Sequence, residues 1–184
     1  MTASFTRMDE STADQWMEIG AQTSANQGRV ADSILGLLRS LALITDGFGT
    51  DQLTHCLQTA TMAERSGADD EIVFAALLHD VGKAISVPNH PAIAAEIIRP
   101  YVSPDVYEMI RVHQDFQGRH YYAHFGGNPD ARENHREALT PDQWALAETF
   151  ADEWDQKAFD PGYDTLPLEH FEPLVRRVTA KSMI

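Results

Sequence analysis

The chain has 184 residues, which suits one domain with a sizeable core, and its formal net charge is −14. Such a charge argues against nonspecific binding to nucleic acid or an anionic membrane, and no apolar run reaches the roughly 20 residues of a membrane span. Cys56 is the single cysteine, so a disulfide framework is excluded and we expect the reducing cytoplasm as the compartment.

Helical periodicity begins about 30 residues into the chain. Apolar side chains recur at helical spacing from Val30 to Leu41, which predicts the first helix of the body. The same spacing from Leu53 to Ala60 predicts a second helix, and Gly67 is placed to end it. The acidic run 69–71 then favours the start of a third helix, which continues through the apolar residues 72–78.

Caps and prolines delimit the helices of the second half. Asn89 is expected to cap a short helix over 90–99, which Pro100 stops. Ser103 begins a helix that runs to His113, with proline at the tolerated first position. Thr140 opens a capping box, and the helix behind it extends to residue 155. The final helix carries the apolar residues Phe171, Leu174, Val175 and Val178.

These elements define the fold class and the domain plan. Because no alternating strand of useful length is present, we predict an all-α, single-domain helical bundle over residues 29–184. Residues 1–28 form an N-terminal extension, and Trp16 and Met17 favour its packing on the body. The polar, glycine-containing region 116–139 is predicted to be a long loop that acts as a lid or binding loop. The oligomeric state stays open.

One pair of neighbouring residues points to chemistry. His79 and Asp80 end the apolar run 72–78 and are followed by Val81, Gly82 and Lys83. An imidazole and a carboxylate are costly to bury unless they are paired or bind a metal. The pair therefore offers a nitrogen ligand and a carboxylate that could bridge two metals.

Four further residues complete a candidate dinuclear metal site. Each of the six lies at or near the end of a predicted helix, and bundle cores are a usual place for such sites. Four imidazoles and two carboxylates suit iron, manganese or zinc and not calcium, which prefers oxygen ligands alone. A single histidine is more often a surface or satisfied core residue, but the ordered set favours a site. The set is His55, His79, Asp80, His90, His113 and Asp155.

In these residues the chain resembles the HD-domain superfamily, in its dinuclear six-ligand branch, over about residues 30–180. The resemblance implies that one metal is held by His55, His79, Asp80 and Asp155. It implies that the second metal is held by Asp80, His90 and His113, with Asp80 as the bridge. The fold it implies is the helical bundle of the HD-domain type.

Several stretches are most similar to the mixed-valent di-iron oxygenases, which include a phosphonate-cleaving oxygenase and myo-inositol oxygenase. The similarity is strongest over residues 52–58 and 64–69. It implies two iron ions (Fe²⁺/Fe³⁺) that use dioxygen to oxidise a small hydroxylated, hydroxyphosphonate-like substrate with C–P or C–C cleavage. The alternative is a phosphohydrolase that uses manganese or another divalent metal on a nucleotide or phosphate ester. A metal-binding scaffold without catalysis is the third reading.

Lys83 is the candidate for a catalytic and substrate-binding residue, because it lies one helical turn beyond His79 and carries a compact ammonium group. The alternative for Lys83 is an exposed lysine that stabilises a helix C-terminus. The other substrate-binding candidates are Gln58, Arg119, His120 and His124, and the last three are equally compatible with an ordinary loop. Asp152 stands where the phosphonate oxygenase carries an arginine, so the resemblance also allows a cationic substrate group near Asp46, Asp51 or Asp152. The alternative for these three acids is a solvated helix end.

Overall fold

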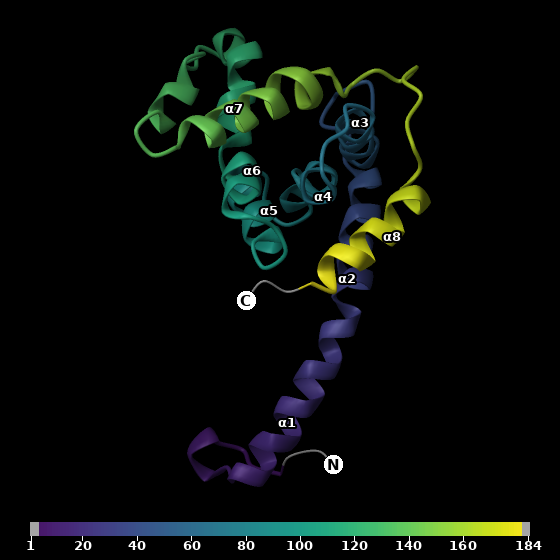
Figure 1. Ribbon diagram of the computed structural model, residues 1–184, viewed down its shortest axis with the longest axis vertical. Coiled ribbons are helices and arrows are strands. Elements are labelled where there is room, and N and C mark those ends of the chain that lie inside the picture. Colours follow the sequence, from purple (N-terminus) through teal and green to yellow (C-terminus); the bar gives the residue numbers. More distant parts are fainter. Residues whose placement is uncertain (1–3, 182–184) are drawn as a thin grey trace.

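The structure is a computed structural model that describes residues 4–181, and every regular element within this range is helical (Figure 1). The predicted all-α, single-domain bundle is confirmed. None of the described helices is long and apolar enough to cross a membrane. The α-helices are α1 (Ala13–Asn26), α2 (Val30–Ser40), α3 (Gln52–Arg65), α4 (Asp70–Leu78), α5 (His90–Ile98), α6 (Pro104–Gln117), α7 (Pro141–Thr149) and α8 (Leu168–Thr179).

Short helical turns connect the α-helices, and one of them continues α7 as a π-helix, η9 (Phe150–Trp154). The remaining short elements are 3₁₀ turns. They are η1 (Met8–Glu10), η2 (Gln27–Arg29), η3 (Leu41–Leu43), η4 (Val81–Ala84), η5 (Val87–Asn89), η6 (Gly118–His120), η7 (Tyr122–Phe125), η8 (Ala131–His135) and η10 (Asp155–Lys157).

Helix α4 is the centre of the bundle. Its residues 73–78 are all buried, as expected for a helix that is apolar on every side. It lies between α3 and the pair α5 and α6 (Figure 1), and α8 packs on α4 and α2. The main core contains Phe74, Leu77 and Leu78 from α4, and a smaller cluster forms around Phe116 and Trp144 between α6 and α7.

Most of the predicted helix boundaries are confirmed. The hydroxyl groups of Ser103 and Thr140 accept the backbone N–H groups of Val106 and Gln143, so both residues cap their helices. Gly67 follows α3 with φ of +83°, the left-handed conformation that ends a helix. The predicted capping role of Asn89 is wrong, because its side chain makes no cap hydrogen bond.

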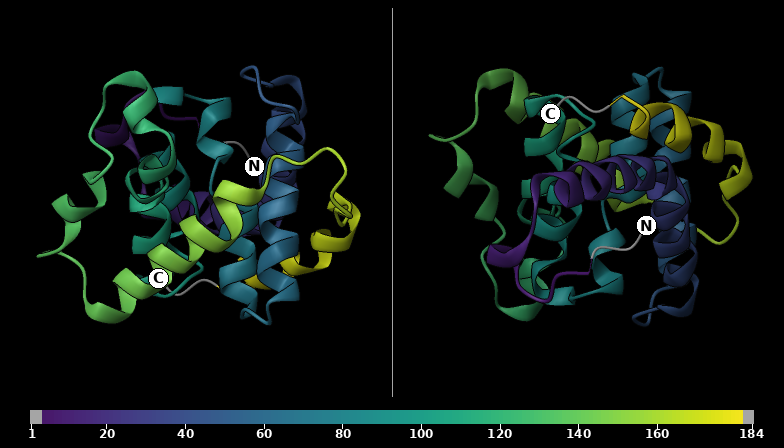
Figure 2. Two further views of the ribbon diagram at one scale, coloured as in Figure 1. Left: turned by 90° about the horizontal axis from the view of Figure 1, so that it is seen from above. Right: turned by 90° about the horizontal axis from the view of Figure 1, so that it is seen from below.

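The region predicted as a long loop, 116–139, is more ordered than expected. Helix α6 extends to Gln117, and η6, η7 and η8 follow it. Figure 2 shows this segment forming one edge of the body. Short 3₁₀ turns lack the repeated apolar spacing that identifies longer helices in a sequence.

The N-terminal extension differs from the prediction that it packs on the body. Helix α1 projects away from the bundle (Figure 1), and none of its residues is buried. Trp16 and Met17, the residues that favoured packing, are 43% and 76% exposed. The apolar core begins at Ala31, on α2.

Candidate metal centre

Five elements bring the six predicted metal ligands to one place. His55 lies in the first turns of α3, His79 and Asp80 follow α4, and His90 begins α5. His113 comes from the last turn of α6, and Asp155 directly follows the π-helix η9. The resulting centre therefore lies where helix ends converge, in the interior of the bundle.

Gly82 is needed to place His90. A Cβ atom at Gly82 would lie 2.3 Å from the backbone carbonyl oxygen of His90, which is too close for any other residue. The turn η4 can therefore approach the start of α5 closely enough for His90 to face Asp80. The Nε2 atom of His90 lies 3.0 Å from Oδ1 of Asp80.

The four histidines share one orientation. In each ring, Nδ1 is hydrogen bonded to a backbone carbonyl oxygen at 2.7–3.0 Å. A carbonyl only accepts, so Nδ1 carries the proton, and in the neutral ring Nε2 is left with a lone pair. The pairs are His55 with Ala158, His79 with Ala76, His90 with Val87 and His113 with Ile110.

The free ring nitrogens face one another and the carboxylates. Nε2 of His55 and Nε2 of His79 are 3.0 Å apart, and both lie within 3.4 Å of Oδ1 of Asp155. Neutral rings with this tautomer would direct lone pairs at each other, which is unfavourable unless a cation or a proton lies between them. The donor set therefore fits a metal ion held between His55, His79 and Asp155.

The two carboxylate oxygens of Asp80 face different pairs of histidines. Oδ2 lies 3.4 Å from Nε2 of His55 and 3.5 Å from Nε2 of His79. Oδ1 lies 3.0 Å from Nε2 of His90 and 3.6 Å from Nε2 of His113. Oδ1 of Asp80 and Oδ2 of Asp155 are buried and accept no hydrogen bond from residues 4–181. Both orphaned oxygens are available to a cation.

The centre thus has an inner half, made of His55, His79 and Asp155, and an outer half, made of His90 and His113, with Asp80 between them. Two groups of three residues have ligand atoms within 4.8 Å of one another: His55 with His79 and Asp155, and His79 with Asp80 and His113. His79 belongs to both groups, whereas the family pattern implies His90 as the third ligand of the second metal.

Burial makes the charge states of this centre interdependent. The six residues are 0–5% exposed. Burial disfavours the imidazolium form of His79, but the carboxylates of Asp80 and Asp155 outweigh it and hold its pKa well above the usual value. Burial opposes the ionised form of Asp80, but the charge on His79 and the close histidine rings outweigh it and hold the pKa of Asp80 well below its usual value. Burial lowers the pKa of His113.

Lys83 reaches the centre, as its spacing from His79 predicts. Its Nζ lies 2.7 Å from Oδ2 of Asp80 and donates to Oε1 of Gln52 at 2.9 Å. Its side chain is 14% exposed. Burial opposes the ammonium form, but Asp80 prevails and raises the pKa of Lys83, so the group stays charged. Gln52 is fully buried, and its Nε2 has no partner within the described part of the chain.

The other predicted substrate residues do not join the centre by any contact in the described range. The Gln58 amide is hydrogen bonded to the backbone of Asp160: its Nε2 donates to the carbonyl oxygen, and its Oε1 accepts from the N–H group. Arg119 and His124 are exposed, and His120 bonds to Oδ1 of Asp152 at 2.8 Å. These residues lie on η6 and η7, whose short turns direct them outward.

Two residues near the centre were missed by sequence reasoning. Gln117 donates from Nε2 to Oδ1 of Asp155 at 2.9 Å and so fixes that carboxylate. Arg132 is 3% exposed and donates to Asp152 and to the carbonyl oxygen of Phe116. Since Arg132 already pairs with Asp152 and His120 is hydrogen bonded to it, the idea of a cationic substrate group at Asp152 loses its support. No spacing signal distinguishes either residue from ordinary surface polar residues.

Comparison with known proteins agrees with this geometry. Residues 53–155 match the HD domain, and the matched range covers more than half of the chain and contains all six predicted ligands. A search of curated proteins gives no match. On the strength of the family match and of the helical bundle around the histidine–aspartate pair, the chain belongs to the HD domain family.

Proposed function

We propose that the chain is a di-iron oxygenase that uses dioxygen to oxidise a small hydroxylated substrate, of the hydroxyphosphonate kind, with C–P or C–C cleavage. The observation that carries the proposal is the position of Asp80, whose two carboxylate oxygens face opposite halves of the centre at 3.0–3.6 Å. A carboxylate that contacts both halves is suited to bridge two metal ions. HD domains usually belong to metal-dependent enzymes.

The donor set supports iron. Four imidazole nitrogens with two carboxylates match borderline first-row metals, and the orientation of each ring by a carbonyl oxygen is typical of metal-ligating histidines. Iron bound here would supply redox chemistry toward dioxygen and Lewis acidity toward a substrate hydroxyl group. The inner half would hold one ion and the outer half the other, with Asp80 shared.

The residues of the chain itself would bind and orient the substrate. The Lys83 ammonium and the unpartnered Nε2 of Gln52 are two donors beside Asp80, and together they suit an oxygen of an alkoxide, carboxylate or phosphonate group. The near-complete burial of the ligands favours a small substrate, since a nucleotide would need a wider opening. The closed surroundings also keep bulk water from the reacting atoms.

The proposed setting follows from composition. The formal net charge of −14 supports a small molecule and dioxygen, without nucleic acid or a membrane, as the partners. The lone Cys56 is a free, buried thiol, which suits the reducing cytoplasm.

A phosphohydrolase is the second candidate, and the position of Lys83 supports it. An ammonium group 2.7 Å from Asp80 would bind a phosphoryl oxygen as well as an alkoxide. In that case the same six ligands would hold manganese or another divalent metal, and the substrate would be a phosphate ester or nucleotide. Lys83 alone does not separate the two chemistries.

Oxygen dependence is the test. Iron-loaded protein would be screened with 1-hydroxyphosphonates, then polyols, then nucleotides, while oxygen uptake and phosphate release are followed together. We expect phosphate only when oxygen is consumed, and an EPR signal of antiferromagnetically coupled Fe²⁺/Fe³⁺ after partial oxidation. Phosphate released without oxygen by manganese-loaded protein, with no oxygen uptake on any substrate, would replace the oxygenase by the hydrolase.

A further inference from the structure

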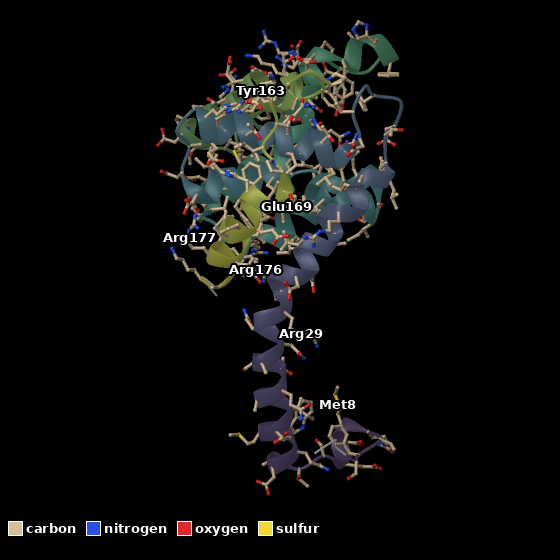
Figure 3. All side chains as sticks on the ribbon, turned by 90° about the vertical axis from the view of Figure 1, so that its right-hand side faces the viewer. Met8, Arg29, Tyr163, Glu169, Arg176 and Arg177 are labelled. Atoms are coloured by element: carbon tan, nitrogen blue, oxygen red, sulfur yellow. The ribbon has the colours of Figure 1, made fainter. Side chains whose placement is uncertain are left out.

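Helix α1 extends from the body, and the segment before it packs on its first turns, where Phe5 contacts Trp16 and Ser11 accepts a hydrogen bond from Nε1 of Trp16. Helix α1 continues the line of α2 through η2, and Figure 3 shows Arg29 at the junction with the body and Met8 near the far end. No residue of α1 is buried. A helix of 14 residues is only marginally stable in water when little packs against it, so a further partner surface would stabilise α1.

The accessible surface area of the chain also indicates a partner surface for α1. The accessible surface is 9999 Å² for a mass of 20.5 kDa, whereas a compact monomer of this mass exposes about 8,900 Å². The excess, about 1,100 Å², exceeds the roughly 800 Å² that each partner buries in an interface of standard size. One further copy of the chain could therefore cover the excess.

The chain cannot use α1 to cover its own body while the junction stays helical. The residues at the junction, Asn26, Gln27, Arg29 and Val30, all have right-handed helical backbone angles. The axis of α1 therefore leads away from α2, as Figure 1 shows, and does not fold back. A second molecule has no such restriction.

One face of α1 is complementary to itself. Helical spacing places Ala13, Trp16, Met17, Gly20 and Ser24 on the same face. The two large side chains, Trp16 and Met17, lie before Gly20, and the residues at and after it on this face, Gly20 and Ser24, are small. In an antiparallel pair centred on Gly20, the large residues of one helix lie against the small residues of the other, and a two-fold axis relates the two halves.

The base of α1 offers a second contact for the same pair. A groove of about 810 Å³ lies there between α2 and α5. An antiparallel pair centred on residue 20 brings residue 13 of one copy beside residue 27 of the other, so the segment before α1 reaches this groove. That segment carries the 74%-exposed Met8, and its Asp9 and Glu10 are paired with Arg7, so the contact it offers the groove is mainly apolar. The apolar lining is Val30, Ile34, Leu37, Ile97 and Tyr101.

From the exposed helix, the excess surface and the complementary face, we propose that the chain forms a two-fold symmetric dimer in which α1 of each copy packs antiparallel against α1 of the other. The first turns of α1 then lie near the groove between α2 and α5 of the second copy. The metal centre lies in the body of each copy, so this dimer is independent of the proposed function.

Gly20→Lys tests the dimer. A Cβ atom at Gly20 meets nothing within 4 Å in the chain itself, and lysine favours a helix more than glycine does, so the variant should fold as well as the wild type. We expect light scattering at micromolar concentration to give twice 20.5 kDa for the wild type and a single chain mass for Gly20→Lys. The control is Gln22→Lys on the opposite face, which should remain a dimer.

A disulfide tests the register. Gly20→Cys should form a cross-linked dimer on oxidation because the two-fold axis passes near residue 20, whereas Gln22→Cys should not. The native Cys56 is buried and does not compete. A wild-type monomer, a Gly20→Lys dimer, or equal cross-linking at positions 20 and 22 would each overturn the proposal.

Discussion

The inner and outer halves of the metal centre differ in how firmly their ligands are held. In the inner half, the ring of Phe159 stacks on His55 at 4.2 Å between centroids, and Gln117 fixes Asp155. The inner ligands are 0–1% exposed. In the outer half, His90 is 5% exposed and begins a short helix after a single 3₁₀ turn. The inner half is therefore the more closely packed of the two, and we expect it to retain an ion more firmly than the outer half.

The largest effect is expected where the two halves meet. Asp80→Ala removes the carboxylate that both halves share and leaves two bound cations to repel each other. We expect the loss of both metals by elemental analysis and the loss of activity. Asp115→Ala is the matched control, because Asp115 bonds to His135 and Tyr122 outside the centre. Unchanged metal content in Asp80→Ala would show that Asp80 is not a ligand.

A comparison of His90→Ala with His55→Ala tests whether the halves are unequal. His90→Ala should lower the metal content from two ions to one, because the inner half keeps three ligands and Asp80. His55→Ala should deplete both ions, since Nε2 of His55 lies close to Asp155 and also to Asp80, the carboxylate that both halves share. Metal content by mass spectrometry and thermal stability would be measured together. Equal loss in the two variants would contradict the difference between the halves.

Lys83→Ala should leave both halves intact and affect the substrate alone. A charge-assisted contact contributes about 1.5–3 kcal/mol, so the affinity for substrate should fall by roughly one to two orders of magnitude. Lys83→Arg should restore it only in part, because a planar guanidinium does not replace a compact ammonium. Gln52→Leu, which removes the acceptor for Nζ, should have a smaller effect of the same kind. Unchanged kinetics in Lys83→Ala would show that Lys83 does not bind the substrate and is an ordinary lysine at a helix end.

The smallest expected effect is the release of protons from the histidines when a metal binds. The carboxylates raise the pKa of His79 well above its usual value in the metal-free chain, and that of His55 is raised despite its burial. A metal must displace these protons, so the metal affinity should fall as the pH falls. Because the two pKa values are raised, the decrease should begin above pH ~6.5, the ordinary pKa of histidine. Calorimetry of metal binding in buffers of different ionisation enthalpy would count about one proton or more released at pH 7. No release would mean that the inner half is neutral before the metal binds.

The sequence predicted the helices and the meeting of the six ligands for a physical reason. Each ligand stands at a helix end, and both apolar spacing and caps such as Ser103 and Thr140 are visible in a single sequence. Once a helical bundle is assumed, the order of the helices along the chain predicts that these helix ends lie close together.

Other features depend on contacts that a sequence does not display. Gln117 and Arg132 became important only because their side chains turn inward, and nothing in their spacing shows it. Gln58 is hydrogen bonded to the backbone of Asp160, a residue 102 positions away, and nothing in the sequence indicates that contact. Trp16 and Met17 are exposed although they are large and apolar, and a single sequence does not show whether such residues pack on the body.

The position of Asp155 in the candidate centre depends on the number of residues in the π-helix η9. A π-turn has about one residue more than an α-turn, so the five residues Phe150–Trp154 set the angle at which Asp155 leaves α7. Removal of one residue there would restore regular α-helical phase and rotate Asp155 by about 100° around the axis, away from His55 and His79. The exposed turn between η7 and η8 does not set the orientation of a ligand residue. Insertions and deletions should therefore be tolerated in that turn and selected against in η9.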